Sequence, residues 1–408
     1  MENRNPSIDS AVQRVVIDQP YVFIPPRFSR VWHGLLRLLL PRMLRKSYGI
    51  TRIECIGAEK LRDSIQAGHS VMIVANHCRP CDPMVLDSLA AAVRTPFHVI
   101  ASWHVFMTGW LHRFLLPRVG GFSIYREGMD RESLKCAVKI LTRGKHPLVV
   151  FPEGIITRSN DRLVHFMEGP AFMARAAAKQ RSDGKVRIHP VFIRYFFEGD
   201  LEKTARPVLE EIERRLSWQP QSQLTLTERI SRIGDALLTL KEKEHGAQAG
   251  SGTFAERLQR LLDHLLIPLE HRWTKGRHDG DVMARAKRLR SAILPDMVAG
   301  NLTDAQKDER WRDLAIIYLI QQLHCYPCGY FDAPTPERIL ETIERFEEDL
   351  TDRARPHLPM RAVILVGDPV EVTAPSGGNR EMDTTTPEIR KRLEHMMEES
   401  KTYRKTPS

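Results

Sequence analysis

Short apolar runs alternate with amphipathic helical patterns between residues 71 and 200. Each run is brief and is followed by turn residues, as is typical of buried strands. The predicted strands are residues 71–75, 97–101, 122–125, 147–151 and 188–196. The predicted helices are about 83–93, 104–116, 131–143 and 164–179, with Asp130 capping the third helix and Gly144 ending it. This alternation predicts an α/β sheet with covering helices.

Residues 201–357 follow a different pattern, which is helical almost throughout. Thr225 and Thr253, each followed by a glutamate three residues later, mark two helix starts, and Thr335 before a proline marks another. About six helices fit this length, and the Gly- and Ala-rich residues 245–252 predict a loop. We recognise no internal repeat in the chain.

A second strand-like stretch follows these helices, at residues 361–366, and a shorter one covers 370–372. An isolated strand leaves its backbone unpaired, so we expect both to join the first sheet. The helical block is then an insertion rather than a separate C-terminal domain. The tail from residue 374 holds one further predicted helix, about 387–399.

The predicted fold is therefore α/β, with a central mixed sheet, covering helices, a large all-helical insertion and an N-terminal amphipathic helix. We expect four parts along the chain. They are an N-terminal arm, 1–47; a core formed by 48–200 and 358–373; a helical insertion, 201–357; and a tail, 374–408.

Residues 27–47 contain six basic residues, no acidic residue, and a tryptophan with seven leucine or methionine side chains between them. Such a helix can lie in the head-group region of a membrane, with arginines on anionic lipid and leucines in the acyl boundary. A helix packed on the core of the protein itself is the alternative. Residues 103–118 are also apolar and aromatic, and predict either a lining for an apolar substrate, a segment that dips into lipid, or a core helix.

Composition narrows the class of protein without choosing a function. The chain is 42% apolar, enough for a large core, and its net charge of +10 favours an anionic partner. The sequence contains no run of about 18 uncharged apolar residues, so we expect no membrane-spanning helix. Six cysteines and no leader-like segment predict reduced thiols and an intracellular address. Together with the basic helix at 27–47, this address predicts a membrane-associated position on the cytoplasmic side.

The densest chemical signal is the segment 71–83, an apolar strand that runs into a turn holding His77 and Asp82. Pro80 and Pro83 exclude a helix through this turn, so we place Asp82 at a helix N-cap with Pro83 in the first helical position. The chain can then fold back until the carboxylate meets one imidazole nitrogen. Asp82 would fix the tautomer of His77, which would act as the general base on a hydroxyl of the acceptor.

Three further blocks follow in order. Residues 120–126 place Arg126 just after a predicted strand, residues 151–154 read Phe-Pro-Glu-Gly before Thr157-Arg158-Ser159, and His189-Pro190-Val191 opens the last strand of the first sheet. Together with the first block, they resemble the glycerophospholipid acyltransferase family, whose bacterial type is the 1-acylglycerol-3-phosphate acyltransferase. That family carries N-H-x4-D, G-x4-R, F-P-E-G-T-R-S and V-P-V-like blocks in this order, and the resemblance covers about residues 50–200 and the strand at 367–369.

The resemblance implies transfer of a fatty acyl group from acyl-CoA or acyl carrier protein to the hydroxyl of a lysophospholipid such as 1-acylglycerol 3-phosphate, at a membrane phospholipid surface. It implies no metal, prosthetic group or other cofactor. By position, His77 and Asp82 are the catalytic pair. The implied substrate-binding residues are Arg126, Glu153, Gly154, Arg158 and Gly121, with Arg126 on the phosphate of the acceptor.

Two departures from the family pattern affect the choice of acceptor. Two isoleucines separate Gly154 from Thr157, so Arg158 is displaced along the chain, and the turn after His77 reads Cys78-Arg79-Pro80-Cys81. Acylation of glycerol 3-phosphate or of another lyso-lipid therefore remains an alternative.

Three other classes of function are alternatives to acyl transfer. Two Cys-x2-Cys pairs, beginning at Cys78 and Cys325, nominally supply four zinc ligands, but they lie far apart and the first would put a metal in the catalytic turn. A non-catalytic lipid-binding scaffold needs neither His77 nor Asp82. Nucleic-acid binding is not expected, because the basic charge comes without a recognition motif.

Overall fold

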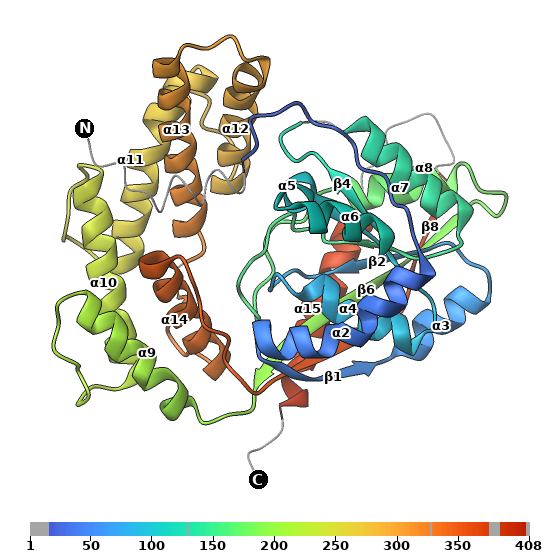
Figure 1. Ribbon diagram of the computed structural model, residues 1–408, viewed down its shortest axis with the longest axis horizontal. Helices are drawn as coiled ribbons and strands as arrows, with labels where there is room; N and C mark the ends of the chain where they lie inside the picture. The colour runs from blue at the N-terminus through green and yellow to red at the C-terminus, as the bar shows by residue number, and fades with distance from the viewer. Residues whose placement is uncertain (1–15, 129, 327–328, 375–383, 405–408) are drawn as a thin grey trace. The chain divides into compact units, whose positions relative to one another are not determined.

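A computed structural model describes residues 16–128, 130–326, 329–374 and 384–404 (Figure 1). Its contacts divide the chain into two compact units. We call residues 23–126, 130–200 and 356–408 the sheet unit, and residues 1–22, 127–129 and 201–355 the helical unit.

The sheet unit is built on one mixed sheet in the order β1-β7-β6-β2-β5-β3-β4, with β8 also pairing with β6. The strands are β1 Ile50–Ile56, β2 Val71–Ala75, β3 His98–Ser102, β4 Gly121–Ile124, β5 Leu148–Val150, β6 Lys185–Phe197, β7 Met360–Val366 and β8 Val370–Thr373. Strands β6, β2, β5, β3 and β4 run parallel, whereas β7 and β8 pair with β6 in the antiparallel sense. The carboxyl ends of the five parallel strands therefore meet at one edge of the sheet.

Helices cover both faces of this sheet (Figure 1). One side carries α7 Arg131–Arg143, α8 Gly169–Ala178 and α15 Thr385–Ser400, and the other carries α2 Arg30–Tyr48, α3 Ala58–Gln66 and α4 Asp82–Ala92. Two short helices, α5 Trp103–Met107 and α6 Trp110–Arg118, pack at β3 and β4, and the 3₁₀ turn Lys401–Tyr403 follows α15. Met72 and Val74 of β2 enter the core under α7, α8 and α15. All five residues of β2 are buried, as expected for a strand covered on both faces.

The N-terminal segment before α2 protects the edge strand β4. Ile24 donates its N–H to Ser123 Oγ at 2.8 Å and accepts the N–H of Ser123 at 3.1 Å, while Arg27 N–H donates to the carbonyl of Pro117 at 2.8 Å. An edge strand with free backbone groups is a site of unwanted pairing. This segment occupies those groups and fixes the start of α2.

The predicted α/β architecture is confirmed, and the seven predicted strands correspond to β2–β8. The expected return of residues 361–366 to the first sheet is also confirmed, since β7 pairs with β6 and with β1. The strand β1 and the helix α3 were not predicted. In β1, the pattern of apolar residues is interrupted by Thr, Arg and Glu, so the strand signal is weak. The helix expected at 104–116 is two helices, because the chain leaves helical geometry at Gly109.

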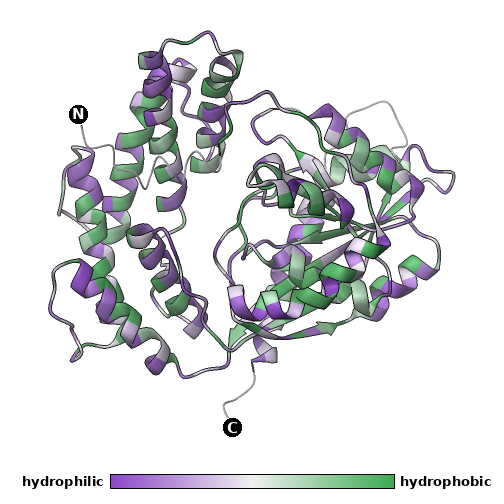
Figure 2. Cartoon of the chain, viewed as in Figure 1, coloured by the Kyte–Doolittle hydropathy of each residue, from purple (hydrophilic) through white to green (hydrophobic). Residues whose placement is uncertain are grey.

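The helical unit contains six described helices in sequence order. They are α9 Leu201–Arg215, α10 Leu226–Glu244, α11 Phe254–Thr274, α12 Val282–Ala299, α13 Asp304–Leu323 and α14 Pro336–Thr351. The predicted capping boxes at Thr225 and Thr253 are present, and Thr335 caps α14 ahead of its proline. Buried leucines and isoleucines of α11, α12 and α13 form the core of this unit. Figure 2 shows the matching division of these helices into hydrophobic and hydrophilic sides.

The expectation that the chain has no internal repeat is wrong. Thr225, Thr253 and Asp281 are the N-caps of α10, α11 and α12, and they follow one another at intervals of 28 residues. The fourth residue of each helix is an arginine that pairs with a buried glutamate near the end of the preceding helix. These pairs are Arg229–Glu213, Arg257–Glu242 and Arg285–Glu270.

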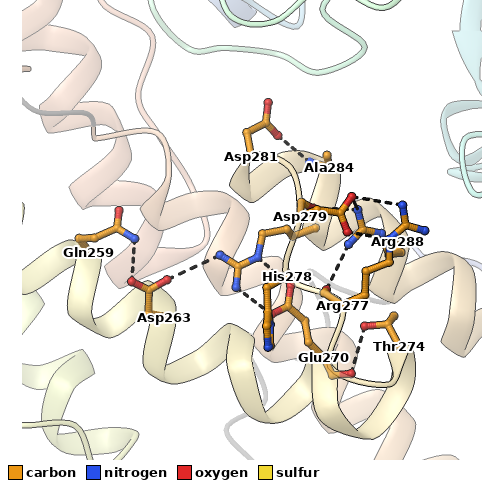
Figure 3. A network of polar contacts seen from close by, with 11 residues as sticks. Gln259, Asp263, Glu270, Thr274, Arg277, His278, Asp279, Asp281, Ala284 and Arg288 are labelled. Atoms are coloured by element: carbon orange, nitrogen blue, oxygen red, sulfur yellow. Dashed lines mark hydrogen bonds and ion pairs between the residues drawn. The ribbon is translucent and has the colours of Figure 1, made fainter.

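Figure 3 shows the third of these connections, between α11 and α12. Glu270 accepts hydrogen bonds from Arg285 Nε at 2.7 Å and pairs with His278 Nδ1 at 2.6 Å. Arg277 and Arg288 bind Asp279 on the loop itself. The repeat is also present in the sequence, where Thr225, Glu228, Arg229 and Glu242 recur 28 residues later as Thr253, Glu256, Arg257 and Glu270.

Across the described residues, no helix is both long enough and apolar enough to cross a membrane.

Candidate active site

The turn between β2 and α4 brings His77 and Asp82 together. His77 Nδ1 lies 2.8 Å from Asp82 Oδ2, and the side chain of Asp82 is fully buried while that of His77 keeps 15% exposure. A carboxylate acceptor at Nδ1 assigns the proton to that nitrogen, so Nε2 carries the lone pair. The folded-back turn predicted from the two prolines is therefore the geometry observed.

The cap of α4 differs from the prediction. The helix begins at Asp82, with Cys81 as its N-cap and Pro83 in the second position. The Asp82 carboxylate does not bind an amide of its own helix, because Oδ2 accepts the N–H of Arg79 at 2.9 Å in addition to His77. The Asp82 carboxylate thus binds the turn and His77 rather than the first amides of the helix.

The other oxygen of Asp82 has a partner that sequence reasoning missed. Tyr195, on β6, donates its hydroxyl to Asp82 Oδ1 at 2.5 Å and is completely buried. Burial, and then the negative charge of Asp82, raise the pKa of Tyr195 well above its usual value, so the phenol stays neutral and acts as a donor. Its side chain lies 114 residues away from the turn along the chain, and no local motif links the two.

Two asparagines hold the part of β6 that carries Tyr195. β2 pairs with β6 only as far as Ala75 opposite Val191. Beyond that point, the side chain of Asn76 binds both the N–H and the carbonyl of Ile193, at 2.7 and 3.0 Å. Asn160 binds the same two groups of Tyr195, at 2.7 and 2.6 Å. These side-chain amides bind the backbone groups of β6 that β2 would bind if it were longer, and they fix the position of Tyr195.

The backbone of His77 is held from both sides by the predicted third block. Glu153 Oε1 accepts the N–H of His77 at 2.9 Å, and Thr157 N–H donates to the His77 carbonyl at 2.8 Å. The ring of Phe151 stacks on the imidazole with centroids 4.2 Å apart. The segment after β5 therefore fixes both the main chain and the ring plane of His77.

Glu153 is buried, and its second oxygen accepts the N–H of Val164 at 3.0 Å. Burial raises the pKa of Glu153 to about 7, against the lowering effect of these two backbone donors. Its contacts place it behind His77, as a support for the turn. Gly154 follows with φ +66°, a conformation that favours glycine, and a Cβ there would lie 2.4 Å from Met167 Cε.

Arg126 and Gly121 lie at opposite ends of β4. Arg126 follows the strand at the same edge of the sheet as His77, but three strands away in the order β2-β5-β3-β4. At the usual spacing between strands, that separation is about 14 Å. Gly121 begins the strand, is buried, and has no room for a Cβ, which would lie 2.9 Å from the carbonyl oxygen of Leu116. Its position gives it a packing reason to be glycine, and its substrate contact remains a prediction.

Arg158 follows Thr157, the residue that binds the carbonyl of His77, and adopts φ +51°. The two extra isoleucines noted in the sequence lie between Gly154 and this contact, and Ile156 is exposed. The insertion is therefore absorbed on the surface while Thr157 keeps its place beside His77. The structure brings His77, Asp82 and Glu153 into one connected group, whereas Arg126 and Arg158 flank it.

Cys78 and Cys81, the first Cys-x2-Cys pair, are both buried in the turn. Burial and the neighbouring Asp82 raise the pKa of the Cys81 thiol to about 12, so it stays protonated. Among the residues that the structure describes, no three or more His, Cys, Asp or Glu side chains are arranged to hold a metal ion. Cys328, of the second pair, lies outside the described residues.

A protein-family model described as Acyltransferase matches residues 52–194. A search of curated proteins gives no match. The matched segment runs from β1 into β6 and contains His77, Asp82, Arg126, Glu153 and Arg158, and it stops one residue before Tyr195. Residues 52–194 therefore form an acyltransferase domain of the glycerophospholipid acyltransferase family, and the protein is a transferase enzyme.

Proposed function

We propose that this transferase acylates the free hydroxyl of a lysophospholipid at a membrane surface, using a fatty acyl thioester as donor. The leading acceptor is 1-acylglycerol 3-phosphate, and the donor is acyl-CoA or acyl carrier protein. The observation that carries the proposal is the 2.8 Å contact between His77 Nδ1 and a buried carboxylate, which leaves Nε2 available to the acceptor. The acyltransferase domain supports the reaction class.

The chemistry follows from this pair. His77 Nε2 takes the proton of the acceptor hydroxyl as its oxygen attacks the carbonyl carbon of the thioester. Asp82 stabilises the imidazolium that forms. The tetrahedral intermediate then expels the thiolate, which receives the proton from His77, so that the thioester bond breaks and an ester bond replaces it. No side chain of the protein is acylated in this scheme.

Two arginines support a phosphorylated acceptor. Arg126 and Arg158 both lie beyond the carboxyl ends of their strands, on the side of the sheet that carries His77. A guanidinium fork binds a phosphate with two parallel hydrogen bonds. The side chain of Arg126 together with a glycerol phosphate can span the about 14 Å between β4 and β2. We therefore assign Arg126 to the phosphate and Arg158 to a second contact with it.

An exposed apolar surface supports binding to lipid. α2 presents Val31, Leu38 and Leu39 with 78%, 79% and 58% exposure, and the neighbouring α6 presents Trp110 with 78%. Trp32 and Phe114 pack edge to face between the two helices, with centroids 5.1 Å apart. His33 and Arg37 tie the other side of α2 to Asp87 of α4, so α2 cannot turn its leucines inward without losing that pair. A basic helix that shows leucine and tryptophan to solvent suits an anionic membrane surface.

The deciding experiment is a screen of acceptors with labelled acyl-CoA and acyl carrier protein, read by the mass of the product. Lysophosphatidic acid should be acylated in preference to glycerol 3-phosphate and to lyso-lipids without a terminal phosphate. Preference for glycerol 3-phosphate would replace the proposed acceptor while leaving the reaction class intact.

Flotation with vesicles tests the membrane surface separately. Leu38→Ser with Leu39→Ser should reduce binding to vesicles that contain phosphatidylglycerol, because both side chains are exposed and their loss should not disturb the fold. Leu240→Ser, an exposed leucine of the helical unit, is the matched control. Equal flotation of all three proteins would contradict a role for α2.

A further inference from the structure

The fully buried Asp82 carboxylate accepts hydrogen bonds on both oxygens, and among the described residues none of these bonds comes from the side chain of an arginine or a lysine. Oδ2 accepts hydrogen bonds from His77 and from the Arg79 N–H, and Oδ1 accepts one from the Tyr195 hydroxyl, with the Cys78 thiol at 3.9 Å. The Arg79 amide, the phenol and the thiol are neutral. Each oxygen is therefore held in place by donors that bring no opposite formal charge.

Tyr195 is placed to control the orientation of this carboxylate and nothing else in the reaction. It has no exposed surface, so it cannot touch a substrate. Asn160 fixes its backbone on both sides, and Cys81 Sγ lies 3.7 Å from its hydroxyl. The guanidinium of Arg79 lies over its ring, 5.2 Å from the centroid. The phenol can therefore neither swing away nor reach another acceptor without disturbing β6.

We propose that Tyr195 is a positioning residue for acyl transfer, whose hydroxyl holds the Asp82 carboxylate so that Oδ2 faces His77 Nδ1. This inference rests on the proposed role of His77 as the general base. A bond of this kind to a carboxylate orients it without adding a positive charge, whereas an arginine in the same place would offset the negative charge that stabilises the imidazolium. Tyr195 lies outside the segment that matches the family model, so the family resemblance does not assign this role.

Tyr195→Phe removes the hydroxyl and keeps the ring. We expect kcat to fall about tenfold with KM changed less than about twofold, because the lost bond orients the base and does not touch the substrate. The acid limb of the pH profile of kcat/KM should move to higher pH. A carboxylate that has lost a donor holds a proton on the His77 ring more strongly, so a higher pH is needed to free the base.

A second variant moves the same interaction in the opposite direction. 3-Fluorotyrosine incorporated at position 195 is a more acidic phenol and a stronger donor of nearly the same size. It should shift the acid limb to lower pH and leave the thermal midpoint of unfolding unchanged. Tyr330→Phe is the matched control, because it removes the hydroxyl that pairs with Thr342 in the helical unit. It should leave both kcat and the acid limb unchanged.

A spectroscopic measurement separates this inference from the proposed function. The proton between His77 Nδ1 and Asp82 should give a far-downfield ¹H resonance that disappears in His77→Gln and moves downfield in Tyr195→Phe. A wild-type protein that transfers no acyl group would overturn the proposed function, while this resonance still decides the role of Tyr195. An unchanged resonance and acid limb in Tyr195→Phe, or a loss of kcat that only follows the folded fraction, would overturn the inference.

Discussion

Buried carboxylates occur in both units, and the two units satisfy them by different chemistry. In the helical unit, Glu213 is 1% exposed and is neutralised by the guanidinium of Arg229, which donates from Nε and Nη2 at 2.8 Å. In the sheet unit, Asp82 is equally buried but is bound by a phenol, a backbone amide and an imidazole.

The difference explains what each carboxylate can do. The guanidinium of an arginine offsets the charge of its partner, so the pair acts as a structural ion pair between successive helices. Neutral donors hold Asp82 without cancelling its charge, so the charge remains available when His77 accepts a proton. The Arg229–Glu213 pair and the His77–Asp82 pair thus differ in the charge of the donors, although burial and distance are similar.

The largest expected effect is on the proposed catalytic pair, His77 and Asp82. His77→Ala and Asp82→Asn should each lower kcat by about 10³- to 10⁴-fold, because the first removes the base and the second removes the charge and favours the wrong tautomer. Thermal unfolding and turnover should be measured together on each variant. Asp87→Asn, a carboxylate on the same helix that pairs with Arg37, is the control and should retain wild-type turnover in detergent micelles. Full turnover in His77→Ala would refute the mechanism.

The structural pair should respond in the opposite manner. Arg229→Ala leaves Glu213 buried without its partner and should lower the free energy of unfolding of the helical unit by about 3 to 5 kcal/mol. Denaturant titration followed by a probe in that unit measures the change. Arg214→Ala, which removes an exposed arginine of α9 that pairs with Glu210, should cost less than about 1 kcal/mol. If Arg229→Ala and Arg214→Ala lower the free energy of unfolding equally, the buried Arg229–Glu213 pair does not stabilise the helical unit.

A buried histidine of the sheet unit should make stability depend on pH. His189 lies between Ser64 Oγ, at 2.9 Å, and the Gly367 carbonyl, at 3.1 Å, and burial lowers its pKa to about 4. The unfolded chain binds a proton at this residue near pH 6.5 and the folded chain does not. The contribution of His189 to the free energy of unfolding is therefore fully present above about pH 6.5. It is lost as the pH drops toward 4, which lowers the free energy of unfolding by up to roughly 3 kcal/mol.

His189→Gln should flatten this dependence between pH 6.5 and 4, because glutamine does not titrate. Equilibrium unfolding in urea at several pH values checks it, with the exposed His264→Gln as the control. The same slope in wild type and His189→Gln would assign the acid sensitivity to other groups.

The smallest effect concerns the acceptor. Arg126→Lys keeps the charge and loses the fork, so KM for a phosphorylated acceptor should rise about five- to tenfold while kcat changes less. Steady-state kinetics with lysophosphatidic acid measures this, and Arg215→Lys on α9 should leave KM unaltered. If KM for a lyso-lipid without a terminal phosphate rises equally, Arg126 does not bind that group.

Local signals in the sequence determined a large part of this protein. Apolar runs placed β2–β8, the threonine and aspartate caps placed the starts of α7, α10, α11 and α14, and two prolines forced the turn that holds His77 and Asp82. These features depend on neighbours in the chain, so a pattern can carry them. β1 escaped because its strand geometry depends on pairing with β7, which lies some 300 residues later.

Only the tertiary structure decided which distant groups complete the site. Tyr195 and Asn160 meet the β2–α4 turn because β6 continues past the end of β2 and needs new partners. Helix stacking likewise decided that Arg229, Arg257 and Arg285 each pair with a glutamate of the helix before their own. Such contacts are fixed by sheet register and helix stacking, which bring together residues that are not neighbours along the chain. Local signals predicted His77 and Asp82 as the catalytic pair, and the fold supplied the neutral donors that hold the Asp82 carboxylate.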